Sequence, residues 1–297
     1  MNDPAPTVSP RRTTGGALGR ALRSFALIRE SGVGMIGVGL VAIWLLVALF
    51  APLIAPFDPN ATLQPFAKPG TVSAQGGTFW LGTDHIGRDI LSRIVWGSRP
   101  VLFYAPLATA GAYLVGIPMG LAAGYFRGGT DAVMSFLANI ILSFPVLVLY
   151  ILVIATIGAS GINIVIAITF ASAPGIMRIV RGQVFDLRTR DYVAAAQTRG
   201  ESSWYIMLVE ILPNARGPLI VDACLRLGYV VITIGVLGFL GLGLPPPDPD
   251  WGGMINETRG MALAFPHMTV FPCIAISSLV LGFNMLADGL REISLRD

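Results

Sequence analysis

The feature that most constrains this chain is a set of long segments without a single charged side chain. Residues 31–57, 100–126, 132–177 and 260–287 contain no Asp, Glu, Lys or Arg, and residues 218–243 contain only two charges. A charged side chain at the centre of a bilayer is costly, and a helix needs about 20 apolar residues to cross it. These runs therefore predict an all-α membrane protein.

Six transmembrane helices fit these runs. The run 132–177 is too long for one crossing, and "GASG" at 158–161 divides it into two predicted helices joined by a tight turn. The other four runs supply one helix each. The run 31–57 is too long for the apolar part of a signal peptide, so we interpret it as an uncleaved first helix.

The composition agrees with a membrane protein. Apolar residues make up 54% of the chain and charged residues 12%, and the mean hydropathy is +0.71. A soluble domain carries about 25% charged residues, so this chain lacks the means to cover a water-facing surface. Cys224 and Cys273 lie in apolar runs, and His85 and His267 stand alone. We therefore expect neither a disulfide framework nor a metal site.

Arginine and lysine set the predicted orientation. If the N-terminus lies in the cytoplasm, the inside segments carry most of the arginines, concentrated in residues 11–29 and 178–216. The outside segments carry five basic residues: Lys68, Arg88, Arg93, Arg99 and Arg259. Because cytoplasmic loops are enriched in Lys and Arg, both termini are predicted to be cytoplasmic. The three outside arginines at 88–99 depart from this rule, which constrains long loops less strictly.

This topology divides the chain into five parts. They are a cytoplasmic N-terminal segment (1–30), a first transmembrane helix (31–57), an external amphipathic segment (58–99), a core of five transmembrane helices (100–290) with a cytoplasmic loop (178–216), and a cytoplasmic tail (291–297). The external segment and the cytoplasmic loop are the two extramembrane pieces large enough to carry a site.

The cytoplasmic loop contains "DYVAAAQTRGESSWYIMLVEILPNA" at 191–215. Residues 192–199 favour a helix, Gly200 permits a sharp turn, and Ser202 or Ser203 can cap a second helix over 204–212, which we expect to end at the following proline. Two short helices that meet at a glycine form a rigid elbow. One interpretation is a simple connector between two spans; the other is a docking surface, because the alanine face is flat and small.

The external segment contains "FWLGTDHIGRDILSRIVWGSR" at 79–99. Gly82 and Gly87 allow turns. Four charged residues of alternating sign are predicted to form a local network on a short amphipathic helix at the outer interface: Asp84, Arg88, Asp89 and Arg93. No nucleophile or metal ligand accompanies these carboxylates, so we favour a structural or partner-docking role over catalysis.

Polar residues also occur inside the predicted spans. Asp222 and Arg226 are four residues apart and therefore share one helix face. They form either a mutually neutralising pair near the cytoplasmic end of the span or a polar part of a translocation gate, since charges within a membrane usually face a cavity. Asn139 and Ser143, with Pro145, present the same choice between lining a channel and packing on a neighbouring helix.

The spacing within the cytoplasmic loop resembles the EAA loop of ABC importer permeases. That pattern runs Glu-Ala-Ala, three residues, Gly, and nine residues before Ile-x-Leu-Pro, and five positions match it: Ala195, Ala196, Gly200, Leu212 and Pro213. Ala194 occupies the position of the glutamate, and Glu210 that of the isoleucine. The resemblance implies that this loop, including Arg199 and Glu201, is a coupling helix that docks into a groove of an ATPase subunit.

Three further motifs resemble the dipeptide/oligopeptide/nickel permease family, in its C-type subunit. They are the external motif at 79–99, "LGFLGLGLPPPDPDWGGMI" at 237–255 and "FNMLADGLRE" at 283–292, and they occur in the expected order. The resemblance implies a type I ABC importer permease in the inner membrane of a bacterium. We include Asn284, from the last motif, among the candidate channel residues.

The resemblance also implies the partners and the chemistry. Members work as a heterodimer with a second homologous permease, two cytoplasmic ATPase subunits and an extracytoplasmic solute-binding protein. The phosphate-binding pattern G-x-x-x-x-G-K-[ST] does not occur in this sequence, so ATP and Mg²⁺ are expected on the ATPase subunits and no cofactor on this chain.

We expect import of dipeptides or oligopeptides, with nickel complexes, glutathione and opine-like solutes as alternatives within the family. The competing classes are a secondary transporter and a membrane-embedded enzyme. A secondary transporter usually needs carboxylates near the midplane, but five spans have none there and Asp222 is expected near one end of its span. No catalytic constellation for a membrane-embedded enzyme is visible.

Overall fold

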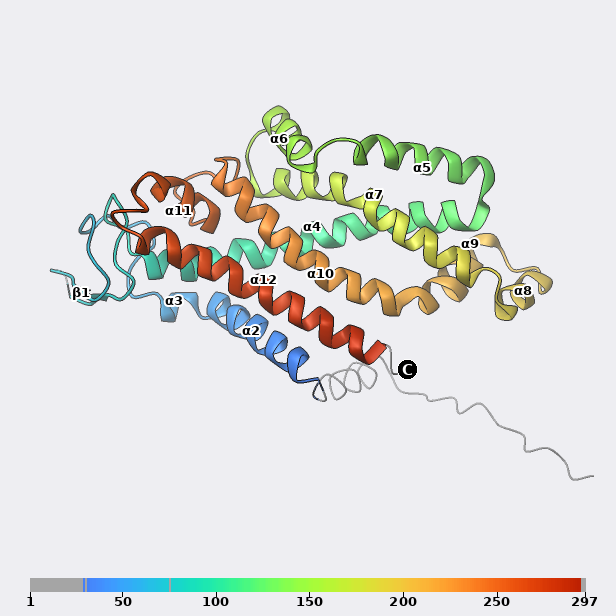
Figure 1. Cartoon of the computed structure of the whole chain (residues 1–297), viewed down its shortest axis with the longest axis horizontal. Coiled ribbons are helices and arrows are strands. Elements are labelled where there is room, and N and C mark those ends of the chain that lie inside the picture. The colour runs from blue at the N-terminus through green and yellow to red at the C-terminus, as the bar shows by residue number, and fades with distance from the viewer. Residues whose placement is uncertain (1–28, 30, 75, 295–297) are drawn as a thin grey trace, which may run out of the picture.

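The computed structural model describes residues 29, 31–74 and 76–294. The rest of the predicted N-terminal segment and the last three residues of the predicted tail lie outside this part of the chain. Figure 1 shows an elongated bundle of long helices, with α8 near one end and a small two-stranded sheet at the other. We refer to these as the α8 end and the sheet end.

The long helices come from the apolar runs. They are α2 (Gly32–Leu49), α4 (Ile90–Phe126), α5 (Gly128–Leu142), α6 (Val146–Ile157), α7 (Gly161–Leu187), α10 (Leu212–Phe239) and α12 (His267–Ser294). The short elements are α3 (Ala51–Ile54), α8 (Asp191–Thr198), α9 (Ser203–Tyr205), the π-helix η1 (Ile206–Ile211), α11 (Trp251–Thr258) and the 3₁₀ turn η2 (Arg259–Met261). Strands β1 (Thr71–Val72) and β2 (Thr78–Phe79) pair antiparallel, with Thr71 opposite Phe79.

Among the described residues, five helices are long and apolar enough to cross a membrane. They are α2, α4, α7, the continuous helix Ser203–Phe239 and most of α12. The sixth predicted crossing corresponds to α5 and α6, which are bent by 86° at a short break. The turn predicted at 158–161 is present, since Gly158 has φ +90° and α7 begins at Gly161.

Two boundaries differ from the sequence prediction. The second span begins at Ile90, ten residues before the apolar run, because Asp89 caps the helix there: its Oδ2 accepts the Ser92 N–H at 2.7 Å. The third span is broken after Leu142, because Pro145 lacks an N–H donor and its ring disfavours helical geometry at the preceding residue.

Small residues bring α4 and α7 close together. Gly116, Gly120 and Gly124 recur every four residues along α4, and a Cβ at Gly120 would lie 2.5 Å from the Cβ of Val180. Such spacing lets two membrane helices approach until their backbones nearly touch. Helix α2 packs on α12 in the same way, since a Cβ at Gly37 would lie 2.4 Å from the backbone nitrogen of Leu286.

Candidate functional site

The predicted elbow is present at the α8 end. Gly200 has φ +78°, the left-handed region that a glycine adopts without strain, and its N–H donates to the Gln197 carbonyl at 2.9 Å. Ser202 caps the next helix, because its hydroxyl accepts the Tyr205 N–H at 3.3 Å. The turn at Gly200 and the helix cap at Ser202 are therefore both present where the sequence predicted them.

The second helix of the elbow does not end at Pro213, contrary to the prediction. It continues through α9, η1 and α10 as one helix from Ser203 to Phe239. Pro213 is tolerated at the second position of α10. There it follows a π-helical segment whose hydrogen bonds already depart from the i→i−4 pattern, so the missing N–H removes no regular bond. The elbow is thus fused to a membrane-spanning helix.

The two faces of α8 have different neighbours. Val193 and Ala196 are fully buried in an apolar cluster that also contains Met207 of η1 and Val180 and Val184 of α7. The opposite face is exposed and carries Ala194, Ala195 and Gln197. Leu212 is partly buried against the same cluster, and Pro213 is exposed. Packing on one face therefore fixes α8 to η1 and α7, and the small side chains on the other leave a flat surface.

Arg199 carries the charge next to this surface. Its guanidinium lies 3.3 Å from Glu210 and 3.7 Å from Glu201, and more than half of the side chain is exposed. Exposed ion pairs of this kind contribute little to stability. Arg199 is thus exposed to a partner and its two glutamates partly so, while the position of the family glutamate, Ala194, offers no charge.

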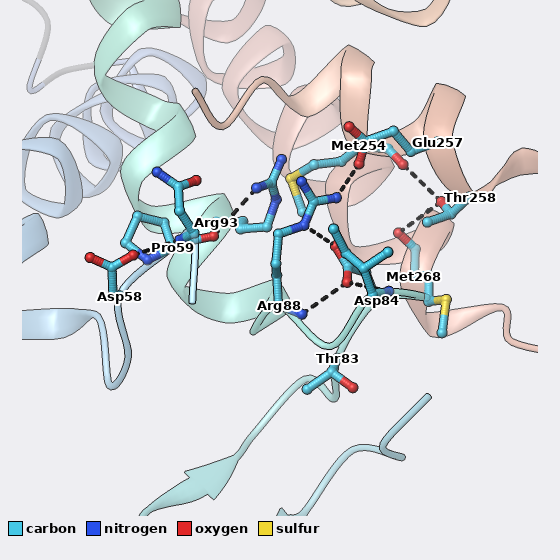
Figure 2. Close-up of polar contacts among 12 residues, drawn as sticks. Asp58, Pro59, Thr83, Asp84, Arg88, Arg93, Met254, Glu257, Thr258 and Met268 are labelled. Atoms are coloured by element: carbon cyan, nitrogen blue, oxygen red, sulfur yellow. Dashed lines mark hydrogen bonds and ion pairs between the residues drawn. The ribbon is translucent and has the colours of Figure 1, made fainter. Parts of the chain in front are cut away.

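The external motif forms a buried network, and the predicted surface amphipathic helix is wrong. Figure 2 shows that Asp84 and Arg88 lie in the loop before α4, and that Arg93 projects from the first turns of α4. Asp84, Arg88, Asp89 and Arg93 are all less than a tenth exposed. Burial of Arg88 is tolerable because Glu257 of α11 offers it a second carboxylate beside that of Asp84.

Hydrogen bonds extend this network across the sheet end. Arg88 Nε lies 2.6 Å from Asp84 Oδ2, and Asp84 Oδ1 accepts the N–H groups of Ile86 and Arg88 at 3.0 and 2.9 Å. Arg93 donates to the Pro59 carbonyl at 3.3 Å. Gly82 and Gly87 have φ of +80° and +92°, as the predicted turns require. The network ties the external loop to α4 and α11.

Asp250 was missed at the sequence level. It caps α11, where its carboxylate accepts the N–H groups of Gly252 and Gly253, both at 3.2 Å, and it is 4% exposed. Burial raises the pKa of Asp250 to about 6, although these backbone donors and Arg93 pull the pKa down. An aspartate directly before the helical stretch "WGGMINET" was the available signal.

The intramembrane pair is formed as predicted and has a third member. Arg226 Nε donates to Asp222 Oδ2 at 2.6 Å, and the hydroxyl of Tyr113 on α4 donates to the same oxygen at 2.5 Å. Each charged side chain is about one-fifth exposed. The pair lies about halfway along the helix Ser203–Phe239, further from its end than the sequence indicated. No sequence spacing could have identified Tyr113, since it comes from another helix.

The other candidate channel residues do not join this pair. Asn139 accepts a hydrogen bond from Arg178 at 2.6 Å, and the Ser143 hydroxyl donates to the Ile140 carbonyl at the break after α5. Asn284 of α12 faces α10, where a Cβ at Gly228 would lie 3.1 Å from its Oδ1. Their roles in a channel stay predictions.

Removing one member of the Asp222/Arg226 pair should destabilise the protein. Asp222→Ala or Arg226→Ala leaves a largely buried charge unpaired, at a cost of roughly 3–5 kcal/mol, and the double change should recover much of the loss. Thermal stability in detergent and abundance in the membrane measure this. Arg199→Ala, which breaks an exposed pair, is the control. Single variants as stable as the wild type would contradict the prediction.

The raised pKa of Asp250 predicts a specific pH dependence. Between pH 4 and 6 the folded protein holds this proton more tightly than the unfolded chain. The contribution of Asp250 to the free energy of unfolding therefore falls by roughly 3 kcal/mol as the pH rises through this window, and is constant above it. The melting temperature of the wild type minus that of Asp250→Asn should therefore decline from pH 4 to 6. Asp248→Asn, at an exposed neighbour, is the control. A pH-independent difference would refute the prediction.

Comparisons with known proteins match this architecture over most of the chain. Residues 116–296 match the family described as "Binding-protein-dependent transport system inner membrane component", and residues 23–69 match the "N-terminal TM domain of oligopeptide transport permease C". The dipeptide transport system permease protein DppC of Alkalihalophilus pseudofirmus is 35% identical over 97% of this chain and 94% of its own. The glutathione transport system permease protein GsiD of Pectobacterium atrosepticum is 35% identical over 83% and 81%.

Solved structures support the fold. A chain of the MetNI methionine ABC transporter in an inward-facing conformation has a TM-score of 0.58 at 19% identity, over 70% of this chain and 97% of that chain. A chain of an amino acid ABC transporter has a TM-score of 0.53 at 16% identity, over 70% and 95%. The predicted all-α membrane fold is therefore confirmed. The chain belongs to the binding-protein-dependent inner membrane components, as a C-type permease subunit of an ABC importer of the dipeptide/oligopeptide/nickel family.

Proposed function

We propose that this chain imports dipeptides or oligopeptides as one half of a heterodimeric channel. The other half is a second homologous permease, and the remaining partners are two ATPase subunits and a solute-binding protein. The observation that carries the coupling role is the fusion of the elbow to the long helix Ser203–Phe239. The peptide assignment rests on the relatives named as dipeptide permeases. Glutathione, itself a modified tripeptide, is the second candidate because other relatives carry that name.

The orientation that we propose places the α8 end in the cytoplasm. Helix α2 begins and α12 ends on the side of the bundle nearer to α8 (Figure 1), which supports two termini on the same side as the elbow. The excess of arginine in the segment around α8 supports the same assignment. The sheet end, with its buried charge network, then faces outward, where the solute-binding protein docks.

Coupling then follows from the packing of α8. An ATPase groove that receives Ala194 and Ala195 moves α8. Helix α8 carries η1 and the C-terminal part of α7 with it, because the three segments share one apolar cluster. Since η1 continues into α10 without a break, a shift of the elbow moves that helix directly. ATP on the ATPase subunits and loaded solute-binding protein outside would thereby bias the equilibrium between inward-open and outward-open states.

The proposed function and the elbow are tested together by uptake. A strain that lacks this chain should lose ATP-driven uptake of labelled dipeptides, and the wild-type gene should restore it. Gly200→Val should insert normally but fail to restore uptake, because a β-branched residue opposes φ +78°. Gly200→Asn, which tolerates this region better, should retain part of the activity, and Gly260→Val, in open space at ordinary φ, is the control. Normal uptake by Gly200→Val would refute the elbow.

The proposed orientation is tested by cysteine labelling. In a variant with Cys224 and Cys273 replaced by Ala, we place single cysteines at Ala74 and Gln197, both exposed. A membrane-impermeant thiol reagent should label Ala74→Cys in intact cells and Gln197→Cys only after the cells are opened. The opposite pattern at either position would overturn the orientation.

A further inference from the structure

A polar cavity lies in the membrane-spanning part of the bundle. Its volume is about 140 Å³, and it is enclosed by α4, α6, α7 and α10. Six polar residues line it: Thr109, Tyr150, Ser172, Arg226, Tyr229 and Thr233. Tyr229 is two-thirds exposed, so the cavity reaches the surface of α10. Five hydroxyl groups and one guanidinium in a membrane interior need an explanation beyond packing, because apolar side chains would fill the space at lower cost.

The guanidinium of Arg226 is held from one side. Its Nε donates to Asp222 Oδ2, and Tyr113 donates to the same oxygen, so this carboxylate is anchored to both α4 and α10. A guanidinium has five N–H donors. Arg226 donates the one on Nε to the Asp222 carboxylate. The other edge, with Nη1 and Nη2, lies over Gly175 of α7: a Cβ there would be 3.4 Å from Nη2 and 3.6 Å from Nη1.

Such a site selects its ligand by charge and shape. The planar fork of an arginine matches a carboxylate, which it binds through two parallel hydrogen bonds. The hydroxyls of Thr109 and Thr233 already donate to the carbonyls of Ala105 and Tyr229, both at 2.9 Å. The hydroxyls of Tyr150, Ser172 and Tyr229 can donate hydrogen bonds to an anion. Oδ2 of Asp222 already accepts from both Tyr113 and Arg226, so this oxygen is not available to a cation. The cavity has room for roughly four to five waters, which is enough for one carboxylate group.

We propose that Arg226 and these hydroxyls form a transient binding site for the terminal carboxylate of a peptide in transit. The proposal rests on the proposed peptide import and adds the group of the substrate that this chain recognises. The charge of the partner Asp222 is equal and opposite to that of Arg226, so the pair has no net charge, which keeps the site weak. Weak binding suits a translocation path, because a solute must also leave.

Charge-selective labelling tests the site independently of transport. In membranes that contain the assembled importer, Thr233→Cys is introduced with Cys224 and Cys273 replaced by Ala. A small anionic methanethiosulfonate should react at least about threefold faster than a cationic one. A dipeptide with a free carboxylate should slow the reaction, and the C-terminal amide of the same dipeptide should not. Arg226→Gln should abolish both effects, while Arg259→Gln, at a cation stacked on Phe239 outside the cavity, should abolish neither.

Each alternative outcome is informative. Equal rates for the two reagents, equal protection by acid and amide, or no reaction at all would overturn the site. If Arg226→Gln reduces the amount of folded protein, the charge-free pair Asp222→Asn/Arg226→Gln serves instead, with the same expected loss of anion preference. If anion preference and acid-specific protection are found in an importer that does not take up peptides, the site stands as a carboxylate site and the peptide assignment alone fails.

Discussion

The close contact of α4 with α7 is the interaction around which the other helices are arranged. In a bilayer, lipid tails surround a leucine as favourably as protein does, so helix association depends on close packing and hydrogen bonds. Gly116, Gly120 and Gly124 provide the packing, because side chains of α7 occupy the space that their own would fill. The pair is the scaffold against which α10 places its polar residues.

Polar groups appear where that scaffold can satisfy them. Tyr113 lies between Gly111 and Gly116 on α4, and from there its hydroxyl reaches Asp222 of α10. The guanidinium of Arg226 lies over Gly175 of α7. At the sheet end the same logic applies to Arg88, whose two carboxylate partners come from its own loop and from α11. Arg226 and Arg88 are thus both held by contacts that join two elements, and these contacts fix the relative positions of α4 and α10 and of the external loop and α11.

Much of the fold could be predicted from the sequence because the membrane imposes it. Charge-free runs indicated the spans, and the glycine at 200 and serine at 202 indicated the elbow, since both are local properties. The pair Asp222/Arg226 followed from helical spacing.

What could not be predicted depends on distant contacts. Glu257, which permits burial of Arg88, lies 169 residues away along the chain, and Tyr113 lies 109 residues from Asp222. The passage of the helix through Pro213 was missed because a proline normally ends a helix, and the π-helical segment before it cannot be read from composition.

The continuity of η1 with α10 links the elbow to the Asp222/Arg226 pair. The elbow packs on η1, and the Asp222/Arg226 pair lies about three turns further along the same helix. A displacement of α8 that moves α10 further than α7 would shift Arg226 relative to Ser172 of α7 and Thr109 of α4, which line the polar cavity. Under the proposed function, such a movement would couple the cavity to the ATPase-docking surface and alter how the guanidinium meets a passing carboxylate.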